Sequence, residues 1–223
     1  MRALIAISSC GDFESNGNNQ ALRDTWLKDA ARLGVPYKFF FGVGQGEPER
    51  EDAVILRDVP DDYEHLTYKT RASLRWAHEH GFTHVFRCFP DTFVRVDRLM
   101  ASGFERFDYL GDFRSEVAGP PNYASGGPGY WLSRKAFSFL INAPVLGIWR
   151  DDITPWAEDL WTGQILGRHV DAALTYRDEW GKFVNHGSRY WPALDNDTIT
   201  AHLSCPDPYD KARMYAAHKV WKS

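Results

Sequence analysis

The sequence predicts a single α/β domain in which a largely parallel sheet is covered by helices. Short apolar runs rich in β-branched and aromatic residues alternate with longer stretches of helical periodicity. This alternation is typical of parallel strands that are joined by helices. The chain has 223 residues, with no internal repeat and no linker of biased composition, so we expect one domain over residues 1–223.

The chain begins with a β-loop-α unit. Residues 3–8 form an apolar run that is too short for a signal-peptide core or a membrane span, and they predict a buried strand. A helix is expected from about 19 to 33, because Gly34 follows as a stop signal. Residues 37–43 predict the second strand, and residues 54–57 predict a third, shorter one.

The next unit leads to a candidate site. Residues 66–80 carry apolar positions on one helical face, and Gly81 stands where a glycine commonly ends a helix. The strand predicted at 83–89 runs almost directly into Asp91. Because open α/β sheets bind ligands at the carboxyl ends of their strands, we expect Asp91 to lie at a binding site.

The second half of the chain is less regular. Strands are predicted at 109–112 and 130–132, and a loop rich in proline and glycine covers 119–129. Helices are expected near 134–142 and 158–168.

Charge and cysteine usage exclude several classes of protein. The formal net charge is −4, which argues against a nucleic-acid partner. Cys10, Cys88 and Cys205 fall in no metal-ligand spacing and cannot all pair within the chain, which favours reduced thiols and a cytoplasmic location. No apolar run is long enough for a transmembrane segment, and no heptad pattern predicts an oligomeric state.

Five segments follow the order and rough spacing of motifs in one enzyme family. Residues 21–26 (ALRDTW) resemble R-x-T-W, and residues 63–70 (YEHLTYKT) resemble Y-x-N-L-T-x-K-T. Residues 91–97 (DTFVRVD) are similar to the end of D-D-D-x-F-V-N-V-D. Residues 125–133 (SGGPGYWLS) resemble S-G-G-x-G-Y-v-l-S, and residues 158–163 (EDLWTG) resemble E-D-V-y-x-G. Together they resemble the beta-1,3-galactosyltransferase and Fringe-like glycosyltransferases, the glycosyltransferase family 31 type.

This resemblance implies a GT-A fold, with a Rossmann-like central mixed sheet flanked by helices. It also implies a metal-dependent, inverting enzyme that uses a nucleotide-sugar donor, usually UDP-linked, with Mn²⁺ or Mg²⁺. We therefore expect transfer of galactose or an N-acetylhexosamine to a glycan acceptor, with a β-1,3-type linkage. The nucleotide-binding half would cover about residues 1–95 and the acceptor-binding half about 96–223. The enzyme would be a cytoplasmic bacterial or viral type, or reside in the Golgi lumen if the chain is part of a longer protein.

The resemblance assigns the metal to Asp91, the counterpart of the last aspartate of the family's acidic triplet, and to His202. A hard cation held by oxygen ligands would neutralise the departing diphosphate. A structural histidine beside a strand is the alternative for His202. Phe89 and Pro90 replace the first two acids, so the D-x-D motif is incomplete. This departure predicts weaker metal binding or a nucleotide other than UDP, and it leaves open a carbohydrate-binding pseudoenzyme or a nucleotide-sugar hydrolase.

Inverting transfer needs a general base for the acceptor hydroxyl. The resemblance assigns this role to Asp159, at the start of a predicted helix whose dipole favours a carboxylate. The alternative for Glu158 and Asp159 is a capping pair with a structural role only. Asp151 and Asp152 form a rival acidic pair without a surrounding motif.

Arg23 and Lys69 are the cations that we expect to bind the nucleotide, because Arg grips phosphate with two donors and Lys acts as a point charge. Ion pairing within the protein is the alternative for each. Gly126 and Gly127 would let the backbone pass close to the donor sugar, although turn formation also explains them. The aromatic segment 178–191 is a candidate lining of the acceptor site, or a core patch.

Overall fold

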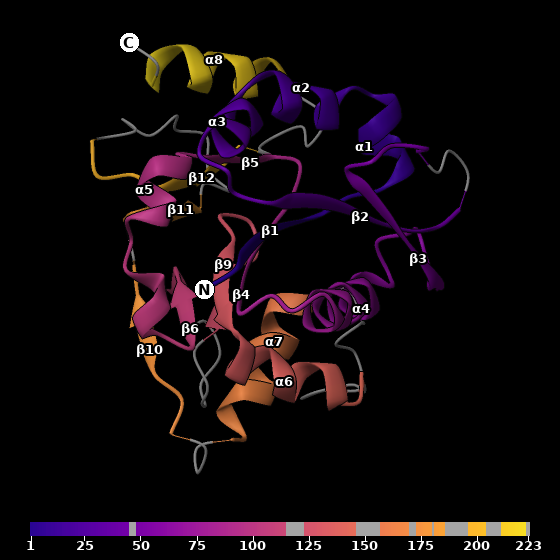
Figure 1. The fold of residues 1–223 in the computed structure, drawn as a ribbon, viewed down its shortest axis with the longest axis vertical. Helices are drawn as coiled ribbons and strands as arrows, with labels where there is room; N and C mark the ends of the chain where they lie inside the picture. Colours follow the sequence, from indigo (N-terminus) through magenta and orange to yellow (C-terminus); the bar gives the residue numbers. More distant parts are fainter. Residues whose placement is uncertain are drawn as a thin grey trace.

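The computed structural model describes residues 1–44, 48–114, 123–145, 157–169, 173–179, 181–185, 196–203 and 211–221. Its centre is a seven-stranded sheet with the strand order β10-β6-β9-β4-β1-β2-β3 (Figure 1). Strands β3, β2, β1 and β4 run parallel, whereas β9 is antiparallel to both β4 and β6. The strands are β1 Ala3–Ser8, β2 Tyr37–Val43, β3 Ala53–Pro60, β4 His84–Cys88, β6 Tyr109–Gly111, β9 Tyr130–Ser133 and β10 Tyr176–Asp178. The predicted α/β architecture with a mixed central sheet is therefore confirmed.

Helices cover both faces of this sheet (Figure 1). On one face lie α1 Gly11–Ser15, α2 Asn18–Asp24, α3 Trp26–Arg32 and the C-terminal α8 Lys211–Trp221. On the other face lie α4 Leu66–Glu79, α6 Arg134–Asn142 and α7 Glu158–Gly167. A short α5 (Val96–Met100) and a 3-10 helix (Phe104–Arg106) follow the end of β5.

Two smaller sheets complete the described part of the chain. One has the order β11-β12-β5, and the other pairs β7 with β8. Their bounds are β5 Thr92–Val94, β7 Phe113–Arg114, β8 Tyr123–Ala124, β11 Phe183–Asn185 and β12 Thr200–His202. The antiparallel pairing of β12 with β5 places His202 opposite Thr92, next to the end of β4.

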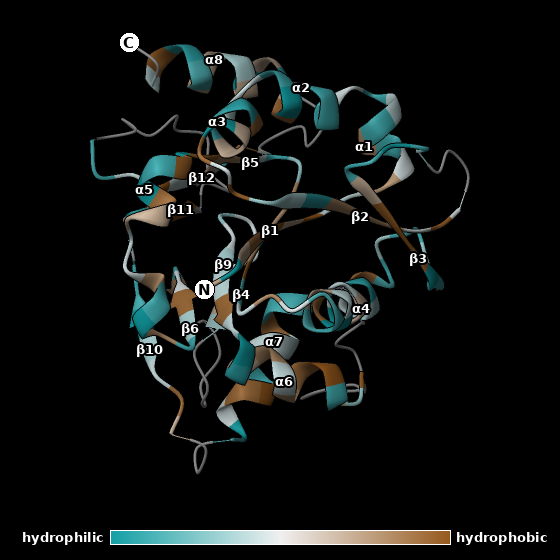
Figure 2. Ribbon diagram, in the orientation of Figure 1, coloured by the Kyte–Doolittle hydropathy of each residue, from teal (hydrophilic) through white to brown (hydrophobic). Residues whose placement is uncertain are grey.

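The central strands are buried on both faces, which explains their continuous apolar sequence. In β1, Ile5 and Ile7 pack into the core beneath α2 and α3, while Leu4 and Ala6 pack into the second core beneath α4 and α6. Figure 2 shows hydrophobic residues along β1, whereas the edge strand β3 also carries hydrophilic residues. The parallel strands β3, β2, β1 and β4 therefore end at one common edge of a well-packed sheet.

The helix expected over 19–33 is divided at Thr25 into α2 and α3. The Thr25 hydroxyl donates to the carbonyl of Ala21 at 2.6 Å and so competes with regular helical bonding. After the break, the Trp26 indole donates to the carbonyl of Thr92 at 3.1 Å. The division ties this helical pair to the segment that follows β4.

Other expectations hold with small shifts of boundary. The helix predicted at 66–80 is α4, and Gly81 follows it with a φ of +75°. The third strand is longer than expected, because β3 pairs with β2 from Phe39 to Val43 through an irregular register. Within the described ranges no helix is long and apolar enough to cross a membrane.

The central sheet takes strands from both sides of residue 95, with β6, β9 and β10 on one side of β4 and β1, β2 and β3 on the other. The assignment of residues 1–95 to the nucleotide and of 96–223 to the acceptor stays a prediction.

Candidate active site

The candidate residues gather at the carboxyl edge of the sheet, after β4. Asp91 lies in the turn between β4 and β5, where the Thr92 amide donates to the Phe89 carbonyl at 3.1 Å. The carbonyl of Asp91 accepts a hydrogen bond from the Leu203 amide at 2.8 Å. Asp91 is therefore fixed by both the β4 turn and the end of β12, at the position where α/β sheets commonly bind ligands.

Asp91 and His202 form a close pair. Nε2 of His202 lies 3.2 Å from Oδ2 of Asp91. Burial opposes the charged imidazole, but the neighbouring Asp91 carboxylate raises the pKa of His202 above its usual value. The second oxygen, Oδ1 of Asp91, is buried and accepts no hydrogen bond from any described residue. This orphaned oxygen needs a partner that the described residues do not supply.

The pair fits one side of a divalent cation site. Carboxylate oxygen and imidazole nitrogen are suitable ligands for Mn²⁺. Across the described ranges, no group of three His, Cys, Asp or Glu side chains could enclose a metal. Any cation at Asp91 and His202 would need further ligands, such as phosphate oxygens or water.

Residues 126–129, which we call the glycine loop, precede β9 and lie directly against the pair formed by Asp91 and His202. The Thr92 hydroxyl donates to the carbonyl of Gly127 at 2.7 Å. A Cβ atom on Gly127 would lie only 2.5 Å from Nδ1 of His202, and one on Gly126 would lie 2.5 Å from Oε1 of Glu158. A side chain at either position would therefore force Glu158 or His202 to shift, because these side chains pack against the glycine backbone.

Asp159 stands in the first turn of α7 and is held by two backbone amides. Its Oδ2 accepts from the amide of Gly126 at 3.0 Å, and its Oδ1 accepts from the amide of Leu160 at 2.9 Å. Each carboxylate oxygen can accept a further hydrogen bond. The glycine loop thus connects Asp159 to the pair formed by Asp91 and His202.

Beneath this loop lies a buried ion pair that sequence reasoning missed. Nη1 of Arg87 lies 2.7 Å from Oε1 of Glu158, and the two side chains are 1% and 2% exposed. The Tyr130 hydroxyl donates to Oε2 of Glu158 at 2.5 Å. Burial raises the pKa of Glu158 to about 7, although Arg87 acts to lower it. The available signal was a single arginine within the apolar strand β4.

Phe89, at the position of the first acid in the motif that residues 91–97 resemble, covers Arg87. The guanidinium carbon of Arg87 lies 3.6 Å from the centre of the Phe89 ring, a cation-π geometry. The Phe89 ring therefore shields a buried cation.

The two predicted phosphate-binding cations have internal partners. Nζ of Lys69 lies 2.6 Å from Asp61 Oδ1 and donates to the Ser9 carbonyl at 2.8 Å. Arg23 pairs with Glu14 at 2.9 Å and with Asp52 at 2.7 Å. Their role in nucleotide binding stays a prediction.

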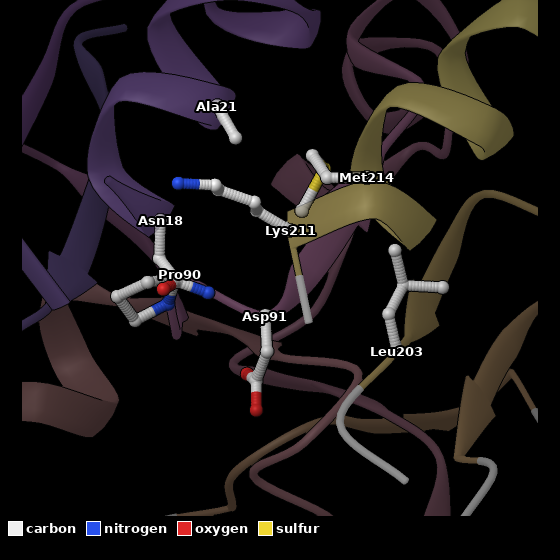
Figure 3. A pocket seen from close by; sticks show the side chains of 7 residues that line it. All are labelled: Asn18, Ala21, Pro90, Asp91, Leu203, Lys211 and Met214. Carbon is white, nitrogen blue, oxygen red and sulfur yellow. The ribbon is translucent and has the colours of Figure 1, made fainter. Parts of the chain in front are cut away.

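A small pocket opens on the α2 and α8 side of Asp91 (Figure 3). In this view Lys211 extends toward Asn18 and Ala21, while the Asp91 carboxylate points away from it. Nζ of Lys211 donates to the carbonyl of Asn16 at 2.9 Å. The lining residues are Asn18, Ala21, Pro90, Asp91, Leu203, Lys211 and Met214.

Tyr63, from the second sequence motif, is an exposed aromatic residue near these carboxylates. It is 66% exposed, yet burial around its hydroxyl and the carboxylates of Asp159 and Glu158 raise the pKa of the phenol. Tyr63 lies in the loop before α4, so the start of the motif at residues 63–70 lies near Asp159 and Glu158.

Asp151 and Asp152 lie outside the described residues, as do Trp180, Tyr190 and Trp191. Phe183 is fully buried, with its ring centre 6.1 Å from that of Phe86.

No known family's sequence profile matches the chain. The fold is similar to that of a solved glycosyltransferase involved in the glycosylation of the major capsid of PBCV-1, with a TM-score of 0.56 and 12% identity. That similarity covers 97% of this chain and 99% of the other. A structure of the galactosyltransferase LgtC with donor and acceptor sugar analogs is also similar, at a TM-score of 0.48 and 12% identity over 99% of this chain and 96% of that one. The first similarity confirms the GT-A fold that the sequence motifs predicted.

Proposed function

We propose that this GT-A domain is a glycosyltransferase that moves a sugar from a nucleotide-diphosphate donor to a hydroxyl of a glycan acceptor. One observation carries the proposal. A continuous set of contacts links Asp91 and His202, through Gly127 and Gly126, to Asp159 at the carboxyl end of β4. A candidate cation site and a candidate base are thus held on one loop, as a transfer from a diphosphate requires.

The finer assignment comes from the five sequence motifs. They support a UDP-linked donor, galactose or an N-acetylhexosamine as the transferred sugar, and a β-1,3-type linkage, as in the beta-1,3-galactosyltransferase and Fringe-like enzymes. The replacement of two acids by Phe89 and Pro90 favours weaker metal binding than a complete D-x-D motif would give.

Asp91 and His202 would hold Mn²⁺ or Mg²⁺ together with the donor phosphates. The buried, orphaned Oδ1 of Asp91 supports this assignment. A divalent cation bound there would neutralise charge on the departing diphosphate. The protein itself contributes a fixed carboxylate, because the Asp91 backbone is held by Leu203.

Asp159 would act as the general base. The acceptor oxygen forms a bond to the anomeric carbon while its proton passes to the Asp159 carboxylate. The bond from the anomeric carbon to the phosphate oxygen breaks, and its electron pair leaves with the nucleoside diphosphate. A single displacement of this kind inverts the anomeric centre. The Gly126 amide would keep the carboxylate in one orientation during the transfer.

A carbohydrate-binding pseudoenzyme is the second candidate. The stacking of Phe89 on Arg87 favours it, because an aromatic ring occupies the place of an acid on the donor side. Such a protein would bind a glycan without binding a nucleotide.

Nucleotide release from a panel of nucleotide sugars, with Mn²⁺ and glycan acceptors, tests the proposal. We expect Asp159→Asn to lower the turnover about 10²- to 10⁴-fold while leaving the nucleotide affinity near that of the wild type. Asp29→Asn, which changes a carboxylate on α3, serves as the matched control and should keep the wild-type rate. Undiminished turnover in Asp159→Asn would contradict the assignment. Glycan binding by a chain that binds no nucleotide would support the second candidate.

A further inference from the structure

We propose that the buried ion pair between Arg87 and Glu158 positions Asp159 and the glycine loop, and so couples the base to the strand that leads into Asp91. This inference rests on the proposed function, since it names two positioning residues for that reaction. Neither side chain is exposed enough to touch a substrate, because they are 1% and 2% exposed.

The ion pair fixes the start of α7 to the central sheet. Arg87 belongs to β4, and Glu158 is the first residue of α7. One carboxylate oxygen of Glu158 contacts Arg87 at 2.7 Å, and the other accepts from the hydroxyl of Tyr130, on β9, at 2.5 Å. Both oxygens are therefore engaged by neighbouring strands, which leaves the first turn of the helix little freedom to move.

The same contacts determine where the reacting groups stand. Asp159 follows Glu158 directly and accepts a hydrogen bond from the Gly126 amide at 3.0 Å. A Cβ atom on Gly126 would lie 2.5 Å from Oε1 of Glu158 and 3.2 Å from Nη1 of Arg87. The glycine loop thus packs directly against the ion pair. A shift of either partner would move the loop and the base together.

The pair is poorly suited to a purely stabilising role. Buried ion pairs are weak sources of stability, because desolvation offsets their attraction. Nη1 of Arg87 makes a close ionic contact without hydrogen-bond alignment, and Nε and Nη2 find no hydrogen-bond partner among the described residues. Replacing a buried ion pair by apolar side chains of similar volume is often neutral or stabilising. What they would not supply is a directed attachment of α7 to β4.

The test removes the charges and keeps the volume. In Arg87→Met/Glu158→Gln, the amide of the new side chain can still accept from the Tyr130 hydroxyl. We expect a denaturation midpoint close to that of the wild type and a nucleotide Kd within about twofold, because neither side chain reaches the donor. The turnover should fall about 100-fold, since small misplacements of reacting groups have effects of that size. Hydrogen exchange at the Gly126 amide, followed by NMR, should become faster.

Several readouts keep the inference falsifiable. Arg87→Met/Glu158→Leu, in which both charges are replaced by apolar side chains, should show the same two losses and serves if the first double variant does not fold. Arg32→Met, which breaks an exposed pair with Asp29 on α3, is the control and should change neither readout. Wild-type turnover and Gly126 exchange in the charge-free variants would overturn the inference. If the wild type binds no nucleotide, the proposed function fails, while Gly126 exchange still decides whether the pair positions the loop.

Discussion

Two clusters of charged side chains lie beside one sheet, and they differ in how completely the protein satisfies them. The scaffold cluster consists of two groups, the pair of Lys69 with Asp61 after β3 and the pairs of Arg23 with Glu14 and with Asp52, which precedes β3. In it, Lys69 meets a carboxylate at 2.6 Å, and Asp61 also accepts from the amides of Gly11 and Gly42 at 2.8 and 2.7 Å. Its members are Glu14, Arg23, Asp52, Asp61 and Lys69.

The site cluster, after β4, is left incomplete. Oδ1 of Asp91 and all three guanidinium nitrogens of Arg87 find no hydrogen-bond partner in the described ranges, although Nη1 of Arg87 makes an ionic contact with Glu158. Its members are Arg87, Asp91, Glu158, Asp159 and His202. Polar groups that a protein satisfies internally hold its loops in place, whereas buried groups without partners mark where a ligand or water completes the structure. Between these two clusters, the unsatisfied atoms lie in the site cluster.

The largest effect is expected from breaking the scaffold cluster. Lys69→Met leaves the buried Asp61 carboxylate without its cation, so the free energy of unfolding should fall by about 3–5 kcal/mol in urea denaturation. Arg32→Met removes an exposed cation and should change it by less than about 0.5 kcal/mol. A stable Lys69→Met variant that has lost nucleotide affinity would move Lys69 from the scaffold to the site.

A smaller effect is expected where the glycine loop meets His202. In Gly127→Ala the new Cβ would lie 2.5 Å from the ring, so the ring must shift away from Asp91. Mn²⁺ affinity, measured by calorimetry with nucleotide present, should fall about 10- to 100-fold, as when the support of a metal ligand is lost.

The matched control for this variant is Gly34→Ala. Gly34 has a φ of +67° and open space around its Cβ position, so alanine there strains the backbone far from the site. It should lower stability without lowering Mn²⁺ affinity. Equal Mn²⁺ affinities in the two variants would show that the loop does not support His202.

The smallest effect, taken per pH unit, is the pH dependence that Glu158 contributes. Its pKa is raised from 4.5 to about 7 chiefly by burial, so the folded state holds a proton that the unfolded state releases between these values. Stability should therefore fall as the pH rises through this window, by at most about 1.4 kcal/mol per pH unit. Urea denaturation of the wild type and of Glu158→Gln would isolate this contribution. A difference that stays flat from pH 4.5 to 7 would contradict the assignment.

The sequence predicted the long and strongly patterned elements, because their apolar periodicity reflects burial directly. Residues 3–8 and 66–80 are strand β1 and helix α4. It did not predict β5, β11 and β12, since three-residue strands carry no measurable period, nor the C-terminal helix α8. The contact of His202 with Asp91 depends on the pairing of β12 with β5, which only tertiary structure reveals.

In the candidate site, too, some residues were predicted from the sequence and others became recognisable only from tertiary contacts. Motif resemblance nominated Asp91, Gly127, Asp159 and His202, and the structure brings them into one set of contacts. It gave no indication of Arg87, because the partner that makes this residue informative lies on α7, far along the chain. The carboxylates that engage Arg23 and Lys69 were missed for the same reason, as Asp52 and Asp61 lie outside every motif.

The most direct test of the incomplete site cluster is calorimetric titration with UDP, GDP and dTDP, each with and without Mn²⁺, on the wild type and on Asp91→Ala. Asp91→Ala removes the orphaned oxygen without touching the scaffold cluster. The account predicts that one nucleotide binds tightly and that its binding requires both Mn²⁺ and Asp91. Absence of nucleotide binding under every condition, or binding that is unchanged in Asp91→Ala, would contradict it.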